Sequence, residues 1–142
     1  MAFIHGKAGY FQLDSSAGSL VDLSTYCNDI GFPQEVSADE TTTFSATDKT
    51  FIVGLGESKI SLAGLVDATL DAHMAGVLAA HKAGTLVTAS FVFGPAGSGN
   101  GAIKYSGEAI LTSYEVSEKV SDVAEWKADL QVTGSVTRGT FS

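Results

Sequence analysis

The sequence predicts a mainly β domain, an antiparallel β-sandwich or partial barrel with one flanking α-helix. In residues 125–136, EWKADLQVTGSV, apolar and polar residues alternate strictly, as in a strand with one buried face. Only one stretch, at about 69–82, has the period of a helix. The chain is 44% hydrophobic and 17% charged, and Ser, Thr and Gly fill the polar positions, which suits sheets. Runs of strands interrupted by one helix favour this layered architecture.

The first half of the chain contains several short predicted strands. Residues 1–10 have no period and are interpreted as an N-terminal arm, and 10–24 as two short strands around a turn at Ser15–Gly18. Residues 25–40, with Gly31, Pro33 and four acidic residues, are expected to form a loop. Further strands are predicted at 41–46, 50–55 and 58–66, separated by turns at Thr47–Lys49 and Gly56–Glu57.

The helix is predicted to run from about 69 to 82. Its apolar face carries Leu70, Met74, Val77 and Leu78, which we expect to pack on the sheet. Asp67 or Thr69 suits the N-cap, and Gly84 lies where a left-handed C-cap is expected.

Three strands are predicted after the helix. They span 85–94, 102–118 and 124–137, with a flexible loop at 95–101 and a bend or bulge at Gly107.

Length, charge and cysteine content restrict the class of protein. A chain of 142 residues suits one domain, 1–142. Sixteen acidic against eight basic residues give a formal charge of −8, which argues against a protein that grips nucleic-acid phosphates. The single cysteine, Cys27, cannot pair within the chain, which favours folding in a reducing compartment. No signal peptide and no apolar run of about 18 residues is present, so we expect no membrane span.

The sequence carries no catalytic or metal-binding signature. His73 and His81 are eight positions apart, whereas a zinc-protease helix places two histidines four apart with a glutamate between them. The glycine-rich stretches at 54–59 and 94–104 lack the full fingerprints of dinucleotide and phosphate loops, and turns explain them. We therefore expect no enzyme activity, cofactor or metal.

The polar faces of the two long C-terminal strands allow two interpretations. Lys104 and Glu108 share one side of the first strand, and Lys127 and Asp129 share one side of the second. They form either an ordinary solvated sheet face or part of an assembling protein, because exposed sheet edges invite pairing and a closed ring removes them.

Several segments, taken in order, resemble the major tail tube proteins of long-tailed, siphovirus-like bacteriophages. They are ETTTFSATDKTFIVGLGESKISLAGLVD (40–67), then FGPAGSGNGAIKYSGEAILTSYEVS (93–117) after the helix, and QVTGSVTRGTF (131–141). Each is weak alone, but their order and spacing together are specific, and the resemblance covers roughly 10–141.

The resemblance implies a structural virion protein that forms stacked homohexameric rings. These rings make a hollow tail tube through which viral DNA is ejected without sequence-specific binding. Implied partners are further copies of the chain, the tape-measure protein, and terminator and initiator proteins, with assembly in the host cytoplasm and no C-terminal immunoglobulin-like domain. The N-terminal arm and the loop at about 25–48 are implied to contact neighbouring rings, with candidate residues Phe3, Ile30, Phe32, Pro33, Glu35, Asp39 and Glu40.

We expect the polar face of the C-terminal strands to line the tube lumen. Acidic and small polar groups repel or ignore phosphates, and the candidates are Glu108, Glu125 and Asp129, together with Lys104 and Lys127. The two lysines either pair with these acids across strands or indicate the wrong face. Two alternatives stay open, the inner tube of a contractile tail or injection system, and a non-tube decoration or adhesion sandwich.

Overall fold

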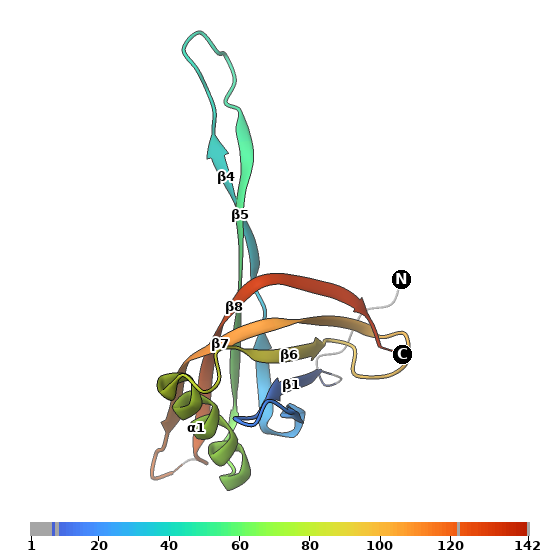
Figure 1. The fold of residues 1–142 in the computed structure, drawn as a ribbon, viewed down its shortest axis with the longest axis vertical. Helices are drawn as coiled ribbons and strands as arrows, with labels where there is room; N and C mark the ends of the chain where they lie inside the picture. Colours follow the sequence, from blue (N-terminus) through green and yellow to red (C-terminus); the bar gives the residue numbers. More distant parts are fainter. Residues whose placement is uncertain (1–6, 8, 122, 142) are drawn as a thin grey trace.

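The computed structural model of the chain describes residues 7, 9–121 and 123–141. Among these residues it is mainly β, with eight strands in one sheet of order β2-β1-β6-β7-β8-β5-β3 and with β4 paired to β5. All of the strand pairs are antiparallel. The sheet curls around its core. The β4–β5 pair projects from one end of the molecule, and α1 lies at the opposite end (Figure 1). This architecture confirms the predicted fold class.

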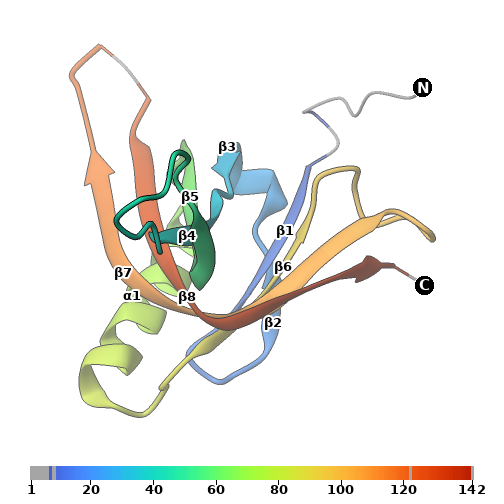
Figure 2. The ribbon, with the colours of Figure 1, turned by 90° about the horizontal axis from the view of Figure 1, so that it is seen from above.

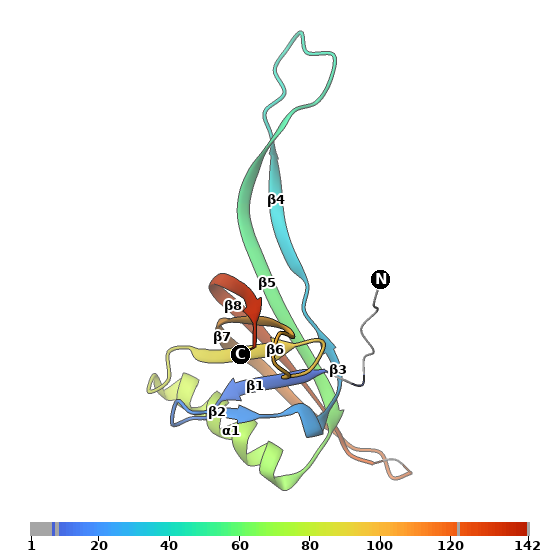
Figure 3. The same ribbon diagram turned by 90° about the vertical axis from the view of Figure 1, so that its right-hand side faces the viewer.

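The helix α1 spans Ala68–Ala83, one residue longer at each end than predicted. The side chain of Asp67 caps it by accepting a hydrogen bond of 2.8 Å from the Thr69 amide. Gly84 ends it with φ 78°, a conformation that glycine adopts without strain. Leu70, Met74 and Val77 are buried on the predicted face, and Leu78 is half-buried against the core. Figure 3 shows α1 beneath β1 and β2.

The N-terminal half contains more strand than the sequence predicts. β1 (Tyr10–Asp14) and β2 (Leu20–Asp22) form the expected hairpin. A short 3-10 helix, η2 (Ser24–Tyr26), follows β2. The prediction of a loop at 25–40 is wrong, because this segment contains β3 (Cys27–Gly31) and β4 (Gln34–Glu40). Both pair with β5, so backbone hydrogen bonding rather than burial defines them.

The strand β5 (Phe51–Leu65) is continuous, where the sequence suggested two strands and a turn at Gly56–Glu57. Gly56 lies opposite Val36 within the β4–β5 ladder, so the glycine is a strand residue. The predicted strand at 41–46 is also wrong, because residues 41–50 connect β4 to β5 and have no further strand beside them.

The three predicted C-terminal strands are confirmed as β6 (Ala89–Gly94), β7 (Ile103–Ser117) and β8 (Glu125–Thr140). β6 begins four residues later than predicted, and β8 ends three residues later. The β7–β8 register shifts between Ser106 and Glu108, at the predicted bulge, and again between Leu111 and Ser113. Gly134, opposite the first bulge, has φ 80°. Both strands bend there through a wide angle, which Figure 2 shows from above. The sheet therefore presents two differently oriented outer surfaces.

The core lies on the inner side of the curled sheet. The alternation in β8 is confirmed, because Trp126, Ala128, Leu130 and Val132 are all buried. They pack with residues of the other strands, of the helix and of the connection between β2 and η2, namely Phe11, Leu13, Leu23, Ile60, Leu62, Leu70, Met74, Val77, Ala89, Phe91, Ala109 and Leu111.

A close approach between β3 and β5 completes the core around Trp126. Trp126 is fully buried, and its indole Nε1 donates a hydrogen bond of 3.1 Å to the Tyr26 carbonyl. Gly64, the partner of Trp126 in the β5–β8 ladder, lies beneath this carbonyl. A Cβ at position 64 would overlap the Tyr26 oxygen and lie 2.8 Å from its carbonyl carbon. Only glycine therefore fits this position.

The helix is tied to the bulged part of β7 by His81. The Leu111 amide donates to His81 Nε2 at 3.2 Å, and His81 Nδ1 lies 2.8 Å from the Leu86 carbonyl. This pattern fits a neutral imidazole that accepts at Nε2 and donates at Nδ1. His81 is thus a packing residue and not a ligand.

None of the helices in the described part of the chain has the length and apolar character needed to cross a membrane.

Candidate self-assembly surfaces

The first candidate surface is the polar outer face of β8 and its neighbours. Glu125, Lys127 and Asp129 are exposed on one side of β8, two residues apart. Ser113 of β7 donates to the Asp129 carboxylate at 3.2 Å, and Glu115 lies directly opposite Lys127. The structure therefore brings three of the five lumen candidates together, in a setting of alternating charge.

The other two lumen candidates lie beyond the bend in β7. Glu108 accepts hydrogen bonds from Thr88, at 2.9 Å, and from Ser90, so its carboxylate is fixed over β6. Lys104 lies further along, with its Nζ 5.6 Å from the centre of the Phe141 ring. Because the bend separates these two residues from Glu125, Lys127 and Asp129, the five candidates do not form one flat patch.

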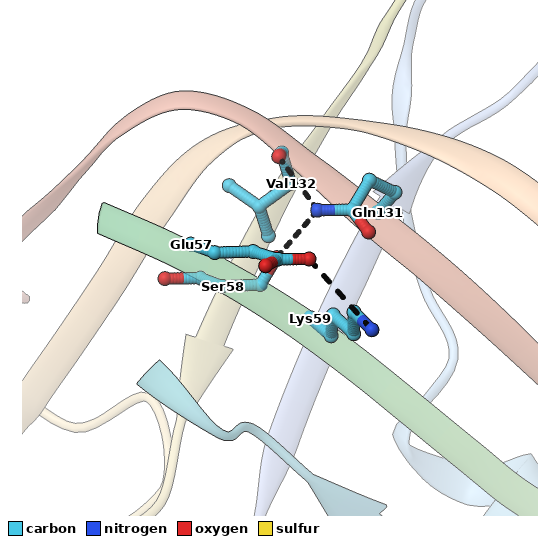
Figure 4. Close-up of polar contacts among 5 residues, drawn as sticks. All are labelled: Glu57, Ser58, Lys59, Gln131 and Val132. Atoms are coloured by element: carbon cyan, nitrogen blue, oxygen red, sulfur yellow. Dashed lines mark hydrogen bonds and ion pairs between the residues drawn. The ribbon is translucent and has the colours of Figure 1, made fainter. Parts of the chain in front are cut away.

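Of the two alternatives left open for Lys104 and Lys127, cross-strand ion pairs with these acids are not seen among the described residues. An ion pair of 3.7 Å instead joins Lys59 and Glu57, which lie two residues apart on one face of β5. Figure 4 shows this pair beside Gln131 of β8, which donates to the Ser58 carbonyl at 3.2 Å. This is the point at which β5 leaves β8, since Lys59 opposite Gln131 is the last pair of their ladder.

The second candidate surface is a projecting hairpin, defined here as residues 34–58. It consists of β4, the connection 41–50 and the part of β5 that has left β8, and it rises from the body as two strands (Figures 1 and 3). At about 3.3 Å per residue, the unsupported part of β5 alone extends roughly 25 Å. All residues of β4 and of the connection are exposed.

The two faces of the projecting hairpin differ in chemistry. Cross-strand partners share a face, so Val36, Ala38, Val53 and Phe51 lie on one side with Glu40. This mostly apolar face continues the core-facing side of β5. Val53 is 78% exposed and Phe44 at the tip is fully exposed, because nothing in the described part of the chain covers them.

The opposite face of the projecting hairpin is acidic. Glu35 lies directly opposite Glu57, and Asp39 lies opposite Ile52. Glu57 follows the same alternation along β5 as Lys59 and Ser61, which pair with β8 beside the lumen candidates. The acidic face of the hairpin is therefore continuous with the polar outer face of the sheet.

The predicted inter-ring residues separate into two groups. Ile30 and Phe32 pack against the chain's own core, and the Phe32 ring makes edge contacts with Phe91, Phe93 and Tyr105 at 5.5–5.9 Å. The remaining candidates are exposed, with Pro33 just before β4 and with Glu35, Asp39 and Glu40 on it; Phe3 and most of the N-terminal arm lie outside the described residues.

Sequence reasoning missed the apolar residues of the projecting hairpin, Phe44, Phe51, Ile52, Val53 and Leu55. The available signal was the run FIVGL at 51–55, in which adjacent positions are all apolar or glycine. A strand with one buried face does not have this pattern, whereas a strand covered on both faces does.

The described residues contain neither a reactive thiol nor a cluster of metal ligands. Burial raises the pKa of the Cys27 thiol to about 12, with a further contribution from Asp22, so the thiol stays protonated and unreactive. No group of three potential metal ligands occurs among the described residues.

The burial of the His73 side chain predicts that the protein loses stability at acidic pH. Burial lowers the pKa of His73 below its ordinary value, although Asp14 acts in the opposite direction, and its Nε2 is buried with no hydrogen-bond partner within the described residues. As pH falls below about 6.5, the unfolded chain takes up a proton that the folded chain resists. The free energy of unfolding of the monomer should therefore fall between pH 7.5 and 5.5, and less so in His73→Gln. Urea titrations at both pH values measure this, and equal losses in both proteins would contradict it.

No protein-family model matches the sequence, and no curated protein matches it either. Solved assemblies that contain chains of similar structure include the following three. A chain in the tail of an empty gene transfer agent (GTA) particle, refined with C6 symmetry, has a TM-score of 0.75 and 13% identity over 97% of this chain and 100% of that one. A chain of the SPP1 tail tube has a TM-score of 0.70 and 16% identity, covering 99% of this chain and 81% of that one.

The third assembly is an extracellular contractile injection system, the PVC sheath-tube complex in its extended state. Its similar chain has a TM-score of 0.70 and 12% identity, covering 97% of this chain and 92% of that one. At these identities the likeness shows the fold, which agrees with the resemblance seen in the sequence. The chain has the tail-tube fold.

Proposed function

We propose that this protein is a structural subunit of a viral tail tube, which assembles into stacked hexameric rings around a channel for DNA. The observation that carries the proposal is the projecting hairpin. A two-stranded hairpin without further cover is marginally stable in water, and this one exposes apolar side chains on a segment that contributes nothing to its own core. A second copy that covers the apolar face would supply the missing contacts.

The side chains on the apolar face are large enough to make such a contact strong. Burying a valine or phenylalanine contributes about 1.5–3 kcal/mol, so covering Val36, Phe51 and Val53 offsets several kcal/mol of association cost. The similar chains of the GTA tail and the SPP1 tail tube come from assembled tails, which supports self-association through this fold.

The polar outer face of β5, β7 and β8 is the proposed lumen wall. Its exposed acids, Glu125 and Asp129 on β8 and Glu115 on β7, repel the phosphates of passing DNA. Lys127 lies between the two acids of β8 and opposite Glu115, so acidic residues flank it on both strands. Under this proposal the chain is not an enzyme, and its further partners are the tape-measure, terminator and initiator proteins of a virion tail assembled in the host.

Reversing charge on this wall should slow the passage of DNA. Glu125→Lys with Asp129→Lys replaces two carboxylates by ammonium groups that attract phosphates, and the effect should weaken with salt. Virions carrying the double variant are expected to eject DNA more slowly in a fluorescent-dye assay. Lys82→Glu on α1 is a control outside this wall. Unchanged ejection from normally assembled tails would argue against this face as the lumen.

The proposal is tested by negative-stain electron microscopy of the purified chain at increasing concentration, in low and high salt. Hollow tubes or rings with an axial hole support it, and high salt should promote them by screening the charge of −8. Particles that stay monomeric in every condition, including in the presence of tail initiator proteins, overturn it in favour of a free-standing decoration or adhesion sandwich.

The inner tube of a contractile system is a second candidate. The PVC chain and the SPP1 chain have the same TM-score with this protein, so the fold fits both kinds of tube. A sheath gene next to the gene for this chain, and a sheath around the tubes in electron micrographs, would favour the contractile system.

A further inference from the structure

Asn100 and Gly101 lie in the middle of an exposed turn between β6 and β7. The Ala102 amide donates a hydrogen bond of 3.0 Å to the Gly99 carbonyl, which closes the β-turn 99–102. Gly101 has φ 85°, the left-handed conformation that the third residue of a type II turn requires. Both central residues are exposed, and the Asn100 side chain has no hydrogen-bond partner among the described residues. The side-chain amide is therefore free to approach the backbone that follows it.

The Asn-Gly pair allows a reaction between a side chain and the backbone. Asparagine is a thermolabile residue, and glycine has no Cβ that shields its nitrogen. In this reaction the Gly101 amide gives its proton to hydroxide, and its nitrogen forms a bond to the Asn100 Cγ. The side-chain amino group takes up a proton from water and leaves as ammonia, which regenerates the hydroxide. Water then opens the resulting succinimide ring at one of its two carbonyls and gives aspartate or isoaspartate.

The other asparagine of the sequence is less suited to this reaction. Asn28 and Asn100 are the two asparagines of the chain. Asn28 lies in β3, which pairs with β5, and it is followed by Asp29, whose nitrogen has a Cβ beside it. The strand pairing restrains the backbone rotation that ring closure needs. The reaction is therefore expected at Asn100 and not at Asn28.

A contact with the C-terminal end of the chain holds the reactive nitrogen. The Gly101 amide donates a hydrogen bond of 2.7 Å to the Phe141 carbonyl, and the Phe141 amide donates one of 3.0 Å to the Ala102 carbonyl. The β6–β7 connection accordingly lies beside the end of β8 (Figure 1). The Phe141 ring makes an edge contact with Tyr10 at 5.8 Å, and the Lys104 Nζ lies 5.6 Å from its centre. While this C-terminal contact holds, the Gly101 nitrogen keeps its proton and does not attack.

We propose that Asn100 is a site of spontaneous deamidation and that the C-terminal contact, between Gly101 and Phe141, sets its rate. The reaction proceeds in molecules in which this contact has opened locally. Isoaspartate adds one carbon to the main chain, so the turn and the bond to Phe141 do not both keep their geometry afterwards. Either product also adds a negative charge to a chain whose formal charge is already −8. This inference goes beyond the proposed function and does not depend on assembly.

Peptide mapping of the purified wild-type protein locates the reaction. After incubation in mildly alkaline buffer, tryptic peptide 83–104 should gain the mass expected for replacement of an amide by a carboxyl group, relative to fresh protein. Peptide 8–49, which contains Asn28, should stay unchanged. Isoaspartyl methyltransferase should label the aged wild-type protein but not an aged Asn100→Ser variant. An unchanged peptide 83–104, or equal rates at the two asparagines, would overturn the assignment.

Phe141→Ala tests whether the C-terminal contact sets the rate. The substitution removes the ring contacts with Tyr10 and Lys104 and leaves the Asn-Gly pair intact. Deamidation should become about fivefold faster, because a hydrogen bond of ordinary strength protects the nitrogen by about this factor. Phe44→Ala removes an equal side chain at the exposed tip of the projecting hairpin and should leave the rate unchanged.

Circular dichroism checks that both phenylalanine variants stay folded, and equal deamidation rates in the two would show that the C-terminal contact does not set the rate. Hydrogen exchange of the wild-type protein, followed by NMR, tests the same point without a substitution. The Gly101 amide should exchange more slowly than the Gly99 amide of the same turn, because it donates to Phe141. Equally fast exchange of the two amides would also overturn this part of the proposal.

Discussion

Gly64→Ala is expected to prevent stable folding, or to lower the free energy of unfolding by about 3 kcal/mol or more. The added Cβ would overlap the Tyr26 carbonyl oxygen and lie 3.0 Å from Cys27 Cα. These are backbone atoms at a junction between η2 and β3, so no side-chain rotation relieves the clash.

The same change should also remove a buried hydrogen bond. If the Tyr26 carbonyl moves away, the indole N–H of Trp126 stays buried without an acceptor, which costs about 1–3 kcal/mol. Because both effects arise from the same clash, we expect them to occur together, and we expect the rest of the sheet to be unaffected.

Urea titration followed by the fluorescence of Trp126, the single tryptophan, measures this loss. Gly139→Ala is the matched control, because Gly139 also lies in a strand and an added Cβ there has no atom within 4 Å. We expect the control to remain within about 0.5 kcal/mol of wild type. Equal stability of the two variants would show that β3 can move away from β5 at little cost.

Phe51→Ser with Val53→Ser is expected to abolish assembly while leaving the monomer folded. Both side chains lie on the apolar face of the projecting hairpin and are more than half exposed, so their loss should change the stability of the monomer by about 0.5 kcal/mol or less. In an assembly that covers this face, each contributes about 1.5–3 kcal/mol, which together weaken association by at least about a hundredfold.

Sedimentation velocity and electron microscopy at matched concentrations measure the assembly of this double variant, and circular dichroism confirms its fold. Val87→Ser removes another exposed apolar side chain, outside the hairpin, and serves as the control. Tubes of normal length from the double variant would mean that the apolar face is not a contact between copies.

The parts of the fold that were predictable from sequence are those that bury one face. In β8 the alternation from Trp126 to Val132 reflects a wall of the core, and in α1 the helical period reflects burial of Leu70, Met74 and Val77. The caps at Asp67 and Gly84 are local in sequence, so they also could be predicted.

The projecting hairpin was not predictable by the same logic. β4, QEVSADE, is exposed on both faces of an isolated ladder, so no burial pattern marks it as a strand. The Thr-rich segment 41–46 has the composition of a strand but lacks a partner, and Gly56 suggests a turn although it lies within a ladder. Because strands are defined by pairing, a strand that lacks a core face leaves little trace in the composition.

The polar face was predictable residue by residue but not in its shape. Sequence alternation places Glu108 and Asp129 on the same side of their strands, yet the bulge at Gly107 and the left-handed conformation of Gly134 turn the strands between them. A period-2 pattern contains no information about such a bend, which only the register of the paired strands reveals.

The strand β5 connects the projecting hairpin directly to the core of the molecule. One strand runs from Phe51 in the hairpin to Leu65 near α1, roughly 50 Å at about 3.3 Å per residue. No loop divides it, although its register with β4 shifts by one residue between Val53 and Gly56. Its lower part is clamped between β3 and β8, where Ile60 and Leu62 are buried. A force applied to the hairpin is therefore expected to tilt β5 and to be transmitted to the core. A neighbour that binds the hairpin would in this way act mechanically on the whole subunit.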